Sequence, residues 1–139
     1  MEAFLLSVHV IAGILFVGPV AVSTSLFPRY AADGGEVAVV LHRITRVYGL
    51  LAVIVPIAGL VLALAQDRTT EVWVLVAMLL TAIAGGLLAL QITPRQRAAL
   101  AASGSTADMR RLGMLTGVFN LLWAVVVVLM IVRPGSSYV

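Results

Sequence analysis

The chain has 139 residues, of which 62% are hydrophobic and only 11% are charged, and its mean hydropathy is +1.13. A soluble domain of this size cannot bury so much apolar surface, so the composition predicts an integral membrane protein with almost nothing outside the bilayer. The net charge of +3 comes from dispersed arginines without an aromatic platform, which excludes nucleic-acid binding, and the absence of cysteine excludes disulfides and thiolate metal sites.

Four apolar stretches are each long enough to cross a bilayer, because a helix rises 1.5 Å per residue and about 20 residues span the hydrocarbon. They cover approximately residues 3–27, 47–65, 72–90 and 112–132. The first stretch has no basic segment before it and is longer than a signal-peptide core, so we expect it to be retained as a helix. The sequence therefore predicts one domain of the all-α membrane class, an antiparallel bundle of four transmembrane helices.

Local signals predict where the helices begin and end. Pro28 is expected to end the regular run of the first helix, and the Asp33-Gly34-Gly35 segment is expected to form a turn. Helix formers with amphipathic spacing over residues 36–46 extend the second helix at its start. Thr93-Pro94 is expected to close the third span, and Ser105 or Thr106 to begin the fourth helix.

The arginines lie on alternate connections between the spans. Seven of the nine basic residues are Arg29, Arg43, Arg46, Arg95, Arg97, Arg110 and Arg111, whereas Arg68 and Arg133 lie on the opposite side. Positively charged loops stay on the cytoplasmic side of a membrane. We therefore expect a bacterial cytoplasmic membrane, the cell inner membrane, with both termini outside the cell and the two long connections in the cytoplasm. Arg43, Arg46, Arg110 and Arg111 are then expected to contact anionic lipid headgroups, and Trp73 and Tyr138 to lie at the outer interface.

Small and polar residues predict how the helices pack, since helices in lipid associate through close approach and a few hydrogen bonds. The residues expected at helix contacts are Gly113, Gly117, Asn120, Thr81, Gly85 and Pro56. The GxxxG step on the fourth helix suits packing within the chain, with a homo-oligomer as the alternative. Asn120 is expected to form a hydrogen bond across helices, and Pro56 to bend the second span and free a carbonyl near Ala52.

His9 is the one ionisable side chain inside a span, and such residues are functional-site candidates by default. Neutral imidazole can be an axial haem ligand, so His9 is the candidate metal ligand, acting through haem b. Met78 and Met130 fall near the same depth on neighbouring helices and complete the candidate cofactor-binding set. The structural alternative is that His9 only donates a hydrogen bond to a carbonyl or a water.

The other histidine, His42, precedes the second span at the opposite side of the membrane. At 1.5 Å per residue it lies more than about 20 Å from His9 along the membrane normal, so the two cannot share an iron. With Arg43 and Arg46 beside it, His42 is expected on a solvated or headgroup-binding face. No carboxylate, lysine or arginine lies in the hydrocarbon core, which disfavours proton-coupled and ion-coupled transport.

Several short motifs together match a known plan. They are Leu-x-x-His9, Phe-Pro28-Arg29, His42-Arg43-x-x-Arg46, Pro56-x-x-Gly59, Thr93-Pro94-Arg-Gln-Arg97 and Met130-Ile-Val-Arg133-Pro134. The chain resembles the small bacterial four-helix membrane proteins of domain-of-unknown-function family 2269. More distantly it is similar to the copper-resistance protein D membrane domain and to the haem-associated membrane protoporphyrinogen oxidases.

The resemblance implies that His9 is the haem ligand of the first helix. The oxidase-like families pair that histidine with a lysine in the third helix, and this chain contains no lysine. We therefore favour a non-enzymatic accessory or assembly subunit that contacts the lipid bilayer and other membrane subunits and holds haem through His9. The alternatives are a haem-dependent membrane oxidoreductase acting on a porphyrin or quinone, and a small transporter of a metal or an apolar solute.

Overall fold

The computed structural model describes residues 1–102 and 105–136, and all of the regular structure in them is helical. The first segment comprises α1 (Glu2–Ala12), the π-helix η1 (Gly13–Val17) and α2 (Gly18–Asp33). The second comprises α3 (Glu36–Leu51) and α4 (Ile54–Ala65). The third comprises α5 (Val72–Leu87), the π-helix η2 (Leu88–Ile92) and α6 (Thr93–Ala101), and the fourth is α7 (Thr106–Val132).

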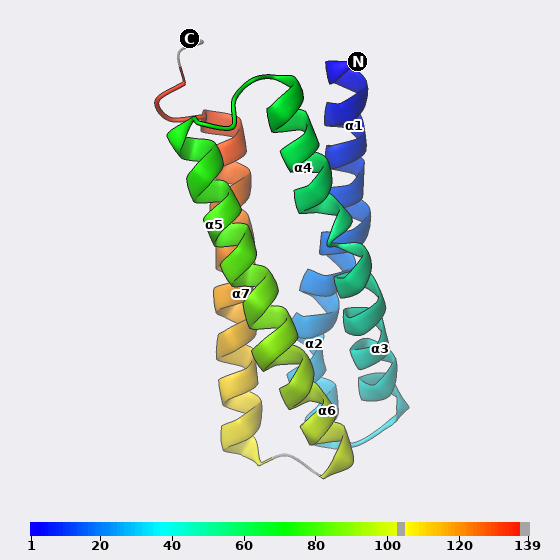
Figure 1. Cartoon of the computed structure of the whole chain (residues 1–139). Coiled ribbons are helices and arrows are strands. Elements are labelled where there is room, and N and C mark those ends of the chain that lie inside the picture. Colours follow the sequence, from blue (N-terminus) through cyan, green and yellow to red (C-terminus); the bar gives the residue numbers. More distant parts are fainter. Residues whose placement is uncertain (103–104, 137–139) are drawn as a thin grey trace.

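These segments form an up-and-down bundle in which consecutive segments are antiparallel (Figure 1). The start of α1, the α4–α5 turn and the end of α7 lie at one end, which we call the termini end. The α2–α3 turn and the end of α6 lie at the other, which we call the arginine end. The halves of the bundle next to these ends are the termini half and the arginine half. Within the described residues, four helical segments are long and apolar enough to cross a membrane, which confirms the predicted four-helix membrane class.

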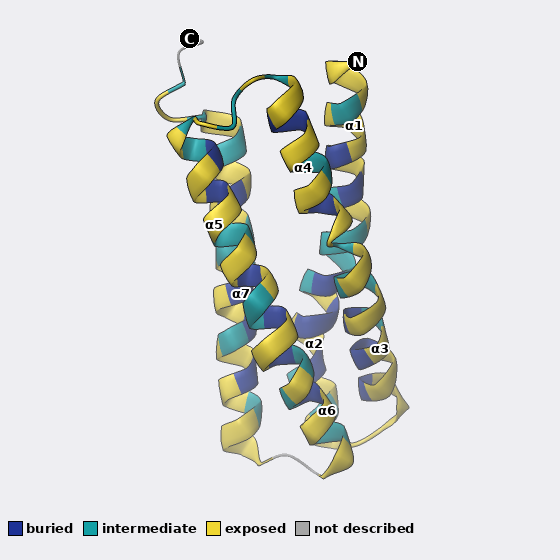
Figure 2. Ribbon diagram, viewed as in Figure 1, coloured by how far each residue is buried: buried dark blue, intermediate teal, exposed yellow. Residues whose placement is uncertain are grey.

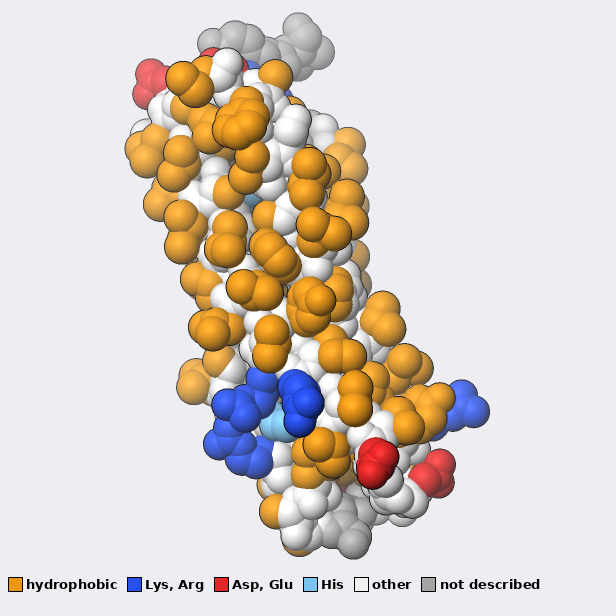
Figure 3. Space-filling model, turned by 90° about the vertical axis from the view of Figure 1, so that its right-hand side faces the viewer, with side chains coloured by type: hydrophobic (Ala, Val, Ile, Leu, Met, Phe, Trp, Pro, Cys, Tyr) orange, Lys and Arg blue, Asp and Glu red, His pale blue; other side chains and the backbone are white. Residues whose placement is uncertain are grey.

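The outer surface of the bundle is apolar along most of its length. Leu50, Leu90 and Ile131 are each more than 70% exposed, and they belong to three different segments. Figure 3 shows hydrophobic side chains covering the middle of one face, with charged side chains gathered toward the two ends. Such a belt is unfavourable in water and is suited to lipid chains, so the protein is a multi-pass membrane protein.

The helices continue past two prolines that were expected to end them. Pro28 lies inside α2, which runs on to Asp33, because another donor replaces the hydrogen bond that proline cannot make. The carbonyl four residues earlier is that of Thr24, and it accepts a hydrogen bond of 3.5 Å from the Thr116 hydroxyl on α7. The prediction that Pro28 ends the regular run was therefore wrong, since a neighbouring helix supplies the missing donor.

Pro94 likewise does not close the third span, which continues through α6 to Ala101. The wider π-helical turn η2 comes directly before it, and a π-helical turn accommodates a break in the regular hydrogen-bond ladder. Pro56 interrupts the second segment as predicted, since α3 ends at Leu51 and α4 begins at Ile54. The Ala52 carbonyl, which has lost its partner at residue 56, accepts from the Val55 amide at 3.0 Å.

The remaining boundary predictions agree with the structure. Gly34 makes the α2–α3 turn with φ +59°, a conformation that favours glycine. The second helix starts at Glu36, as the amphipathic pattern predicted. Ser105 caps α7 in a reciprocal pair with Asp108, whose amide donates to the serine hydroxyl.

Packing is tightest toward the arginine end, where the main core joins α2, α3, α5, η2 and α7 (Figure 2). Its buried residues are Val20, Phe27, Ala38, Leu41, Ala84, Leu88, Ile92, Leu112 and Phe119. Toward the termini end the bundle becomes two helix pairs, α1 on α4 and α5 on α7, with few contacts from one pair to the other. The chain is therefore firmly packed in one half and more divided in the other.

The predicted helix-contact residues have different outcomes. A Cβ atom added at Gly113, Gly117 or Gly85 would meet nothing within 4 Å, so these glycines do not provide the expected close approach within the chain. Asn120 on α7 does cross between helices, because its Nδ2 donates to the Ser25 hydroxyl of α2 at 3.0 Å. The hydrogen-bond prediction is confirmed, and close packing at the GxxxG step is not seen within the described chain.

The Thr116 bond to the carbonyl freed by Pro28 can be measured by a double-mutant cycle. Thr116→Val keeps the shape of the side chain and removes the donor, so we expect it to lower the free energy of unfolding by about 1 kcal/mol. In a Pro28→Ala background, residue 28 can donate to the Thr24 carbonyl itself, and the same change should then cost almost nothing. Thr81→Val is the control, since Thr81 makes no side-chain hydrogen bond to a described residue. Equal costs of Thr116→Val in both backgrounds, measured by denaturant unfolding in micelles, would contradict this explanation.

Candidate functional site

His9 lies on α1 in the termini half and is buried against α4, with 8% of its surface exposed. Its Nδ1 is 3.0 Å from the Val55 carbonyl oxygen, which can only accept. The ring nitrogen Nδ1 must therefore carry a proton and donate. This bond fixes the orientation of the imidazole ring and, in the neutral form, places the free lone pair on Nε2.

Gly59 makes the close approach of His9 to α4 sterically feasible. A Cβ added at this position would lie 2.8 Å from His9 Cε1 and 3.3 Å from Nδ1. Real Cβ atoms essentially never approach another atom as closely as 2.8 Å, so any larger residue would displace the imidazole. Gly59 leaves room for the imidazole ring, and the Val55 carbonyl, one helical turn away on α4, orients it. We call these two residues the His9 seat.

The seat depends on the interruption of the second segment at Pro56. Val55 immediately precedes the proline and lies in the first turn of α4, where the hydrogen-bond pattern changes. His9 itself is followed within four residues by the π-helix η1, which ends just before Gly18 and Pro19. Irregular turns therefore occur on both helices next to the buried histidine. π-Helical turns are frequently found at functional sites in other proteins.

His9 Nε2 makes no hydrogen bond to any residue in ranges 1–102 and 105–136. The hydrogen bond to a carbonyl that was considered for this histidine is thus made by Nδ1 alone. A carbonyl acceptor on one ring nitrogen is the usual arrangement around a metal-ligating histidine, because it fixes the tautomer and makes the other nitrogen a better ligand. Nε2 is therefore the ring nitrogen that the described chain leaves without a hydrogen-bond partner.

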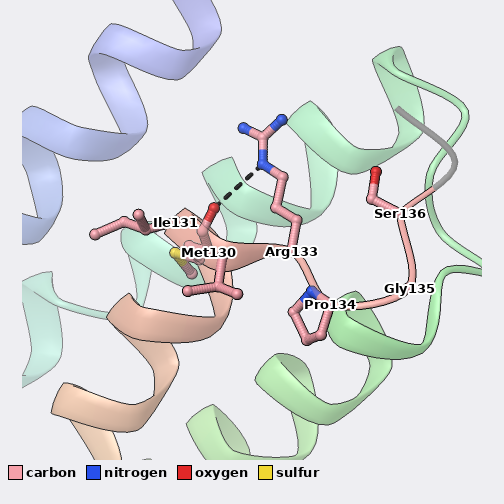
Figure 4. A pocket seen from close by; sticks show the side chains of 7 residues that line it. Met130, Ile131, Arg133, Pro134, Gly135 and Ser136 are labelled. Carbon is pink, nitrogen blue, oxygen red and sulfur yellow. Dashed lines mark hydrogen bonds between the residues drawn. The ribbon is translucent and has the colours of Figure 1, made fainter. Parts of the chain in front are cut away.

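The two methionines predicted near this depth have different surroundings. Met78 lies on α5 and is 42% exposed. Met130, near the end of α7, lines an open pocket of about 640 Å³ together with residues 131–136. Figure 4 shows this pocket, in which the Met130 carbonyl accepts a hydrogen bond of 3.2 Å from Arg133 Nε. One continuous stretch of chain forms its lining, and His9 is not part of it.

Polar contacts also hold the termini end together. Arg133 lies over the Trp73 ring, with its guanidinium carbon 5.7 Å from the ring centroid. The Trp73 indole donates to the Glu71 carboxylate, which also pairs with Arg68 at 3.8 Å. The α4–α5 turn is thereby tied to the end of α7. Trp73 therefore lies at an end of the span, where an interfacial tryptophan is expected, whereas Tyr138 lies outside the described residues.

A second polar cluster lies in the arginine half, and only part of it was predicted. His42 was expected on a solvated face, but it is 8% exposed, and its ring lies 6.4 Å from that of Phe27. Its Nδ1 is 2.9 Å from Oε1 of Gln96, a fully buried residue of α6. One helical turn along α3, the Thr45 and Ser23 hydroxyls are 2.8 Å apart.

Gln96 was not predicted as a site residue, because the third helix was expected to end at Pro94. Once the helix continues, Gln96 lies four residues after Ile92 and eight after Leu88, on the same buried face. That spacing was the available signal. Gly59 likewise was noted only as part of the motif Pro56-x-x-Gly59. Its contact with His9 depends on helix register, which the sequence does not specify.

The arginines named as headgroup contacts all lie in the arginine half or at its end. Arg43 and Arg46 are exposed on α3, and Arg110 and Arg111 are exposed in the first two turns of α7. Figure 3 shows arginine side chains gathered around a histidine toward this end of the molecule. Among the residues that the structure describes, no group of three or more histidine, cysteine or acidic side chains lies close enough to hold a bare metal ion.

Comparisons with known proteins add no assignment to this geometry. The chain matches no family model, and no curated protein and no solved structure is similar enough to be matched.

The seat of His9 predicts different effects for two glycine substitutions. Gly59→Ala should displace the imidazole from the Val55 carbonyl and lower the free energy of unfolding by about 1–2 kcal/mol, since overpacking outweighs the gain in helix propensity. Gly86→Ala is the matched control, because a Cβ there meets nothing within 4 Å, and it should be neutral or stabilising by up to about 1 kcal/mol. Thermal unfolding in micelles measures both, and a stabilising Gly59→Ala would refute the close contact.

Proposed function

We propose that this chain is a small, non-enzymatic subunit of a bacterial cytoplasmic membrane, of accessory or assembly type, that binds haem b through His9. The observation that carries the proposal is the hydrogen bond from His9 Nδ1 to the Val55 carbonyl, which directs the free lone pair to Nε2. Membership of the family of unknown function that the sequence resembles is part of the same proposal.

The residues around His9 fit an axial ligand. The imidazole is buried and its Nδ1 proton is donated to the Val55 carbonyl, so Nε2 is the nitrogen that would ligate iron. The absence of lysine removes the third-helix partner of the oxidase-like families, so we assign no oxidase reaction. Met78 and Met130 stay candidates for a second ligand, and a bound haem would supply an electron-transfer centre or a haem cargo for partner subunits.

The looser contact between the α1–α4 and α5–α7 pairs supports a role in assembly. Helices that meet in few places leave apolar surface for lipid, a partner helix or a flat apolar ligand. His9 belongs to the α1–α4 pair, in the half where the two pairs have few contacts with each other. The main core in the other half fixes the two pairs relative to each other.

Haem binding is tested by titrating purified protein with haemin in micelles and recording the Soret absorbance. We expect one equivalent to bind and His9→Ala to abolish the ligated spectrum, because alanine has no donor to iron. His42→Gln is the matched control and should bind as the wild type does, since His42 is held by other partners in the other half. A spectrum unchanged by His9→Ala, or no ligated spectrum in the wild type, would overturn the assignment.

The proposed orientation is tested with single cysteines, because the chain contains none. Thr70→Cys lies in the exposed α4–α5 turn at the termini end, and Ala102→Cys follows α6 at the arginine end. A membrane-impermeant maleimide added to intact spheroplasts should label Thr70→Cys only, and permeabilisation should expose Ala102→Cys as well. The reverse labelling pattern would show that the arginine-rich connections lie outside.

A further inference from the structure

The side chains of Arg95 and Gln96, at the start of α6, carry buried donors without acceptors. Gln96 is fully buried, and its Nε2 has no hydrogen-bond partner in the described part of the chain. Arg95 Nε is also buried and has none, although its Nη2 donates to Gln91 Oε1 at 3.2 Å. Buried donors are nearly always paired, so two of them in successive residues indicate a missing acceptor.

His42 determines which atom of the Gln96 amide is left over. The bond of 2.9 Å between His42 Nδ1 and Gln96 Oε1 uses the acceptor end of the amide and leaves the donor end unpaired. The Phe27 ring lies beside the imidazole, with the ring planes inclined at 57°. His42 is therefore a positioning residue for a buried amide N–H.

Four arginines lie on α3 and α6 near the residues that hold this amide. α3 packs against α6, and on α3 Arg46 lies one helical turn from His42 on the same face, with Arg43 next to it. Arg95 and Arg97 flank Gln96 on α6. Figure 3 shows arginine side chains around a histidine in this part of the molecule. No ion pair joins any of these arginines to an acidic residue within the described ranges.

We propose that this arginine-half cluster, made of Gln96, Arg95 and Arg46 and positioned by His42, binds a phosphoryl group. A phosphoryl group offers several acceptor oxygens and negative charge at once, which suits one amide N–H and two guanidinium groups. Its source is the headgroup of an anionic phospholipid or free phosphate. Because Gln96 is fully buried, the oxygen reaches its amide only when the partly buried Arg95 side chain moves aside.

This site is more specific than the diffuse attraction between basic loops and an anionic membrane. Diffuse attraction depends on the net charge of the surface, so all exposed arginines at this end contribute similarly. A built site depends on an uncharged residue, Gln96, and on particular arginines. Removing the amide without changing the charge therefore separates the two explanations.

The test measures binding to delipidated protein in neutral detergent by microscale thermophoresis. Mixed micelles containing dioleoyl phosphatidylglycerol are one titrant, and inorganic phosphate alone is the other. We expect Gln96→Leu and Arg95→Gln each to raise the Kd about tenfold, because each removes a charge-assisted hydrogen bond. Arg110→Gln, which removes the same charge from the exposed first turns of α7, should change the Kd less than about twofold.

The two titrants distinguish the sources. Binding of inorganic phosphate with this variant pattern assigns free phosphate, and binding of phosphatidylglycerol alone with the same pattern assigns the lipid headgroup. Equal losses in Arg95→Gln and Arg110→Gln, or no binding of either titrant, would overturn the proposal. If Gln96→Leu fails to fold, the matched arginine pair still decides, because both of those side chains reach the surface.

Discussion

The structure depends on how backbone carbonyls are satisfied where prolines remove a hydrogen-bond donor from helices in lipid. A proline removes one donor, and the hydrocarbon offers no water to replace it. The Thr116 hydroxyl donates to the carbonyl freed by Pro28, and the Val55 amide donates to the carbonyl freed by Pro56. A π-helical turn precedes each of the other two prolines, Pro19 and Pro94. α1 packs against α4, and α6 continues beyond the expected end of its span.

Each polar cluster lies beside one of these prolines. In the termini half, the segment around Pro56 presents the Val55 carbonyl and Gly59 to His9. In the arginine half, the continuation of the helix past Pro94 brings Gln96 to His42. A straight second span and a third span ending at its proline would leave both histidines without these partners. The two contacts thus depend on the break before Pro56 and on the continuation of the helix past Pro94.

The sequence predicted the fold and the half of the molecule in which each histidine lies, and it failed on contacts. Hydropathy alone specifies four spanning helices, because an apolar segment of that length has no other stable form in lipid. Helix register is different: whether Gly59 or Gly113 meets a neighbour depends on rotations that no local signal encodes, and here Gly59 contacts His9 while Gly113 faces open space. The prediction for His42 failed for the related reason that its partner lies beyond a proline treated as a helix end.

The contrast between the two histidines shows why burial alone is a poor guide to their roles. Both are 8% exposed and both use Nδ1 in a hydrogen bond. A backbone carbonyl can only accept a hydrogen bond and carries no second polar group. The bond to His9 therefore leaves the Nε2 atom of the imidazole as the unpaired group. A glutamine amide has a second function, so the bond to His42 leaves the amide N–H of Gln96 as the available group, among arginines. The same kind of contact therefore supports two different proposals, metal ligation by His9 Nε2 and anion binding by the Gln96 amide, because the two partner atoms differ in chemistry.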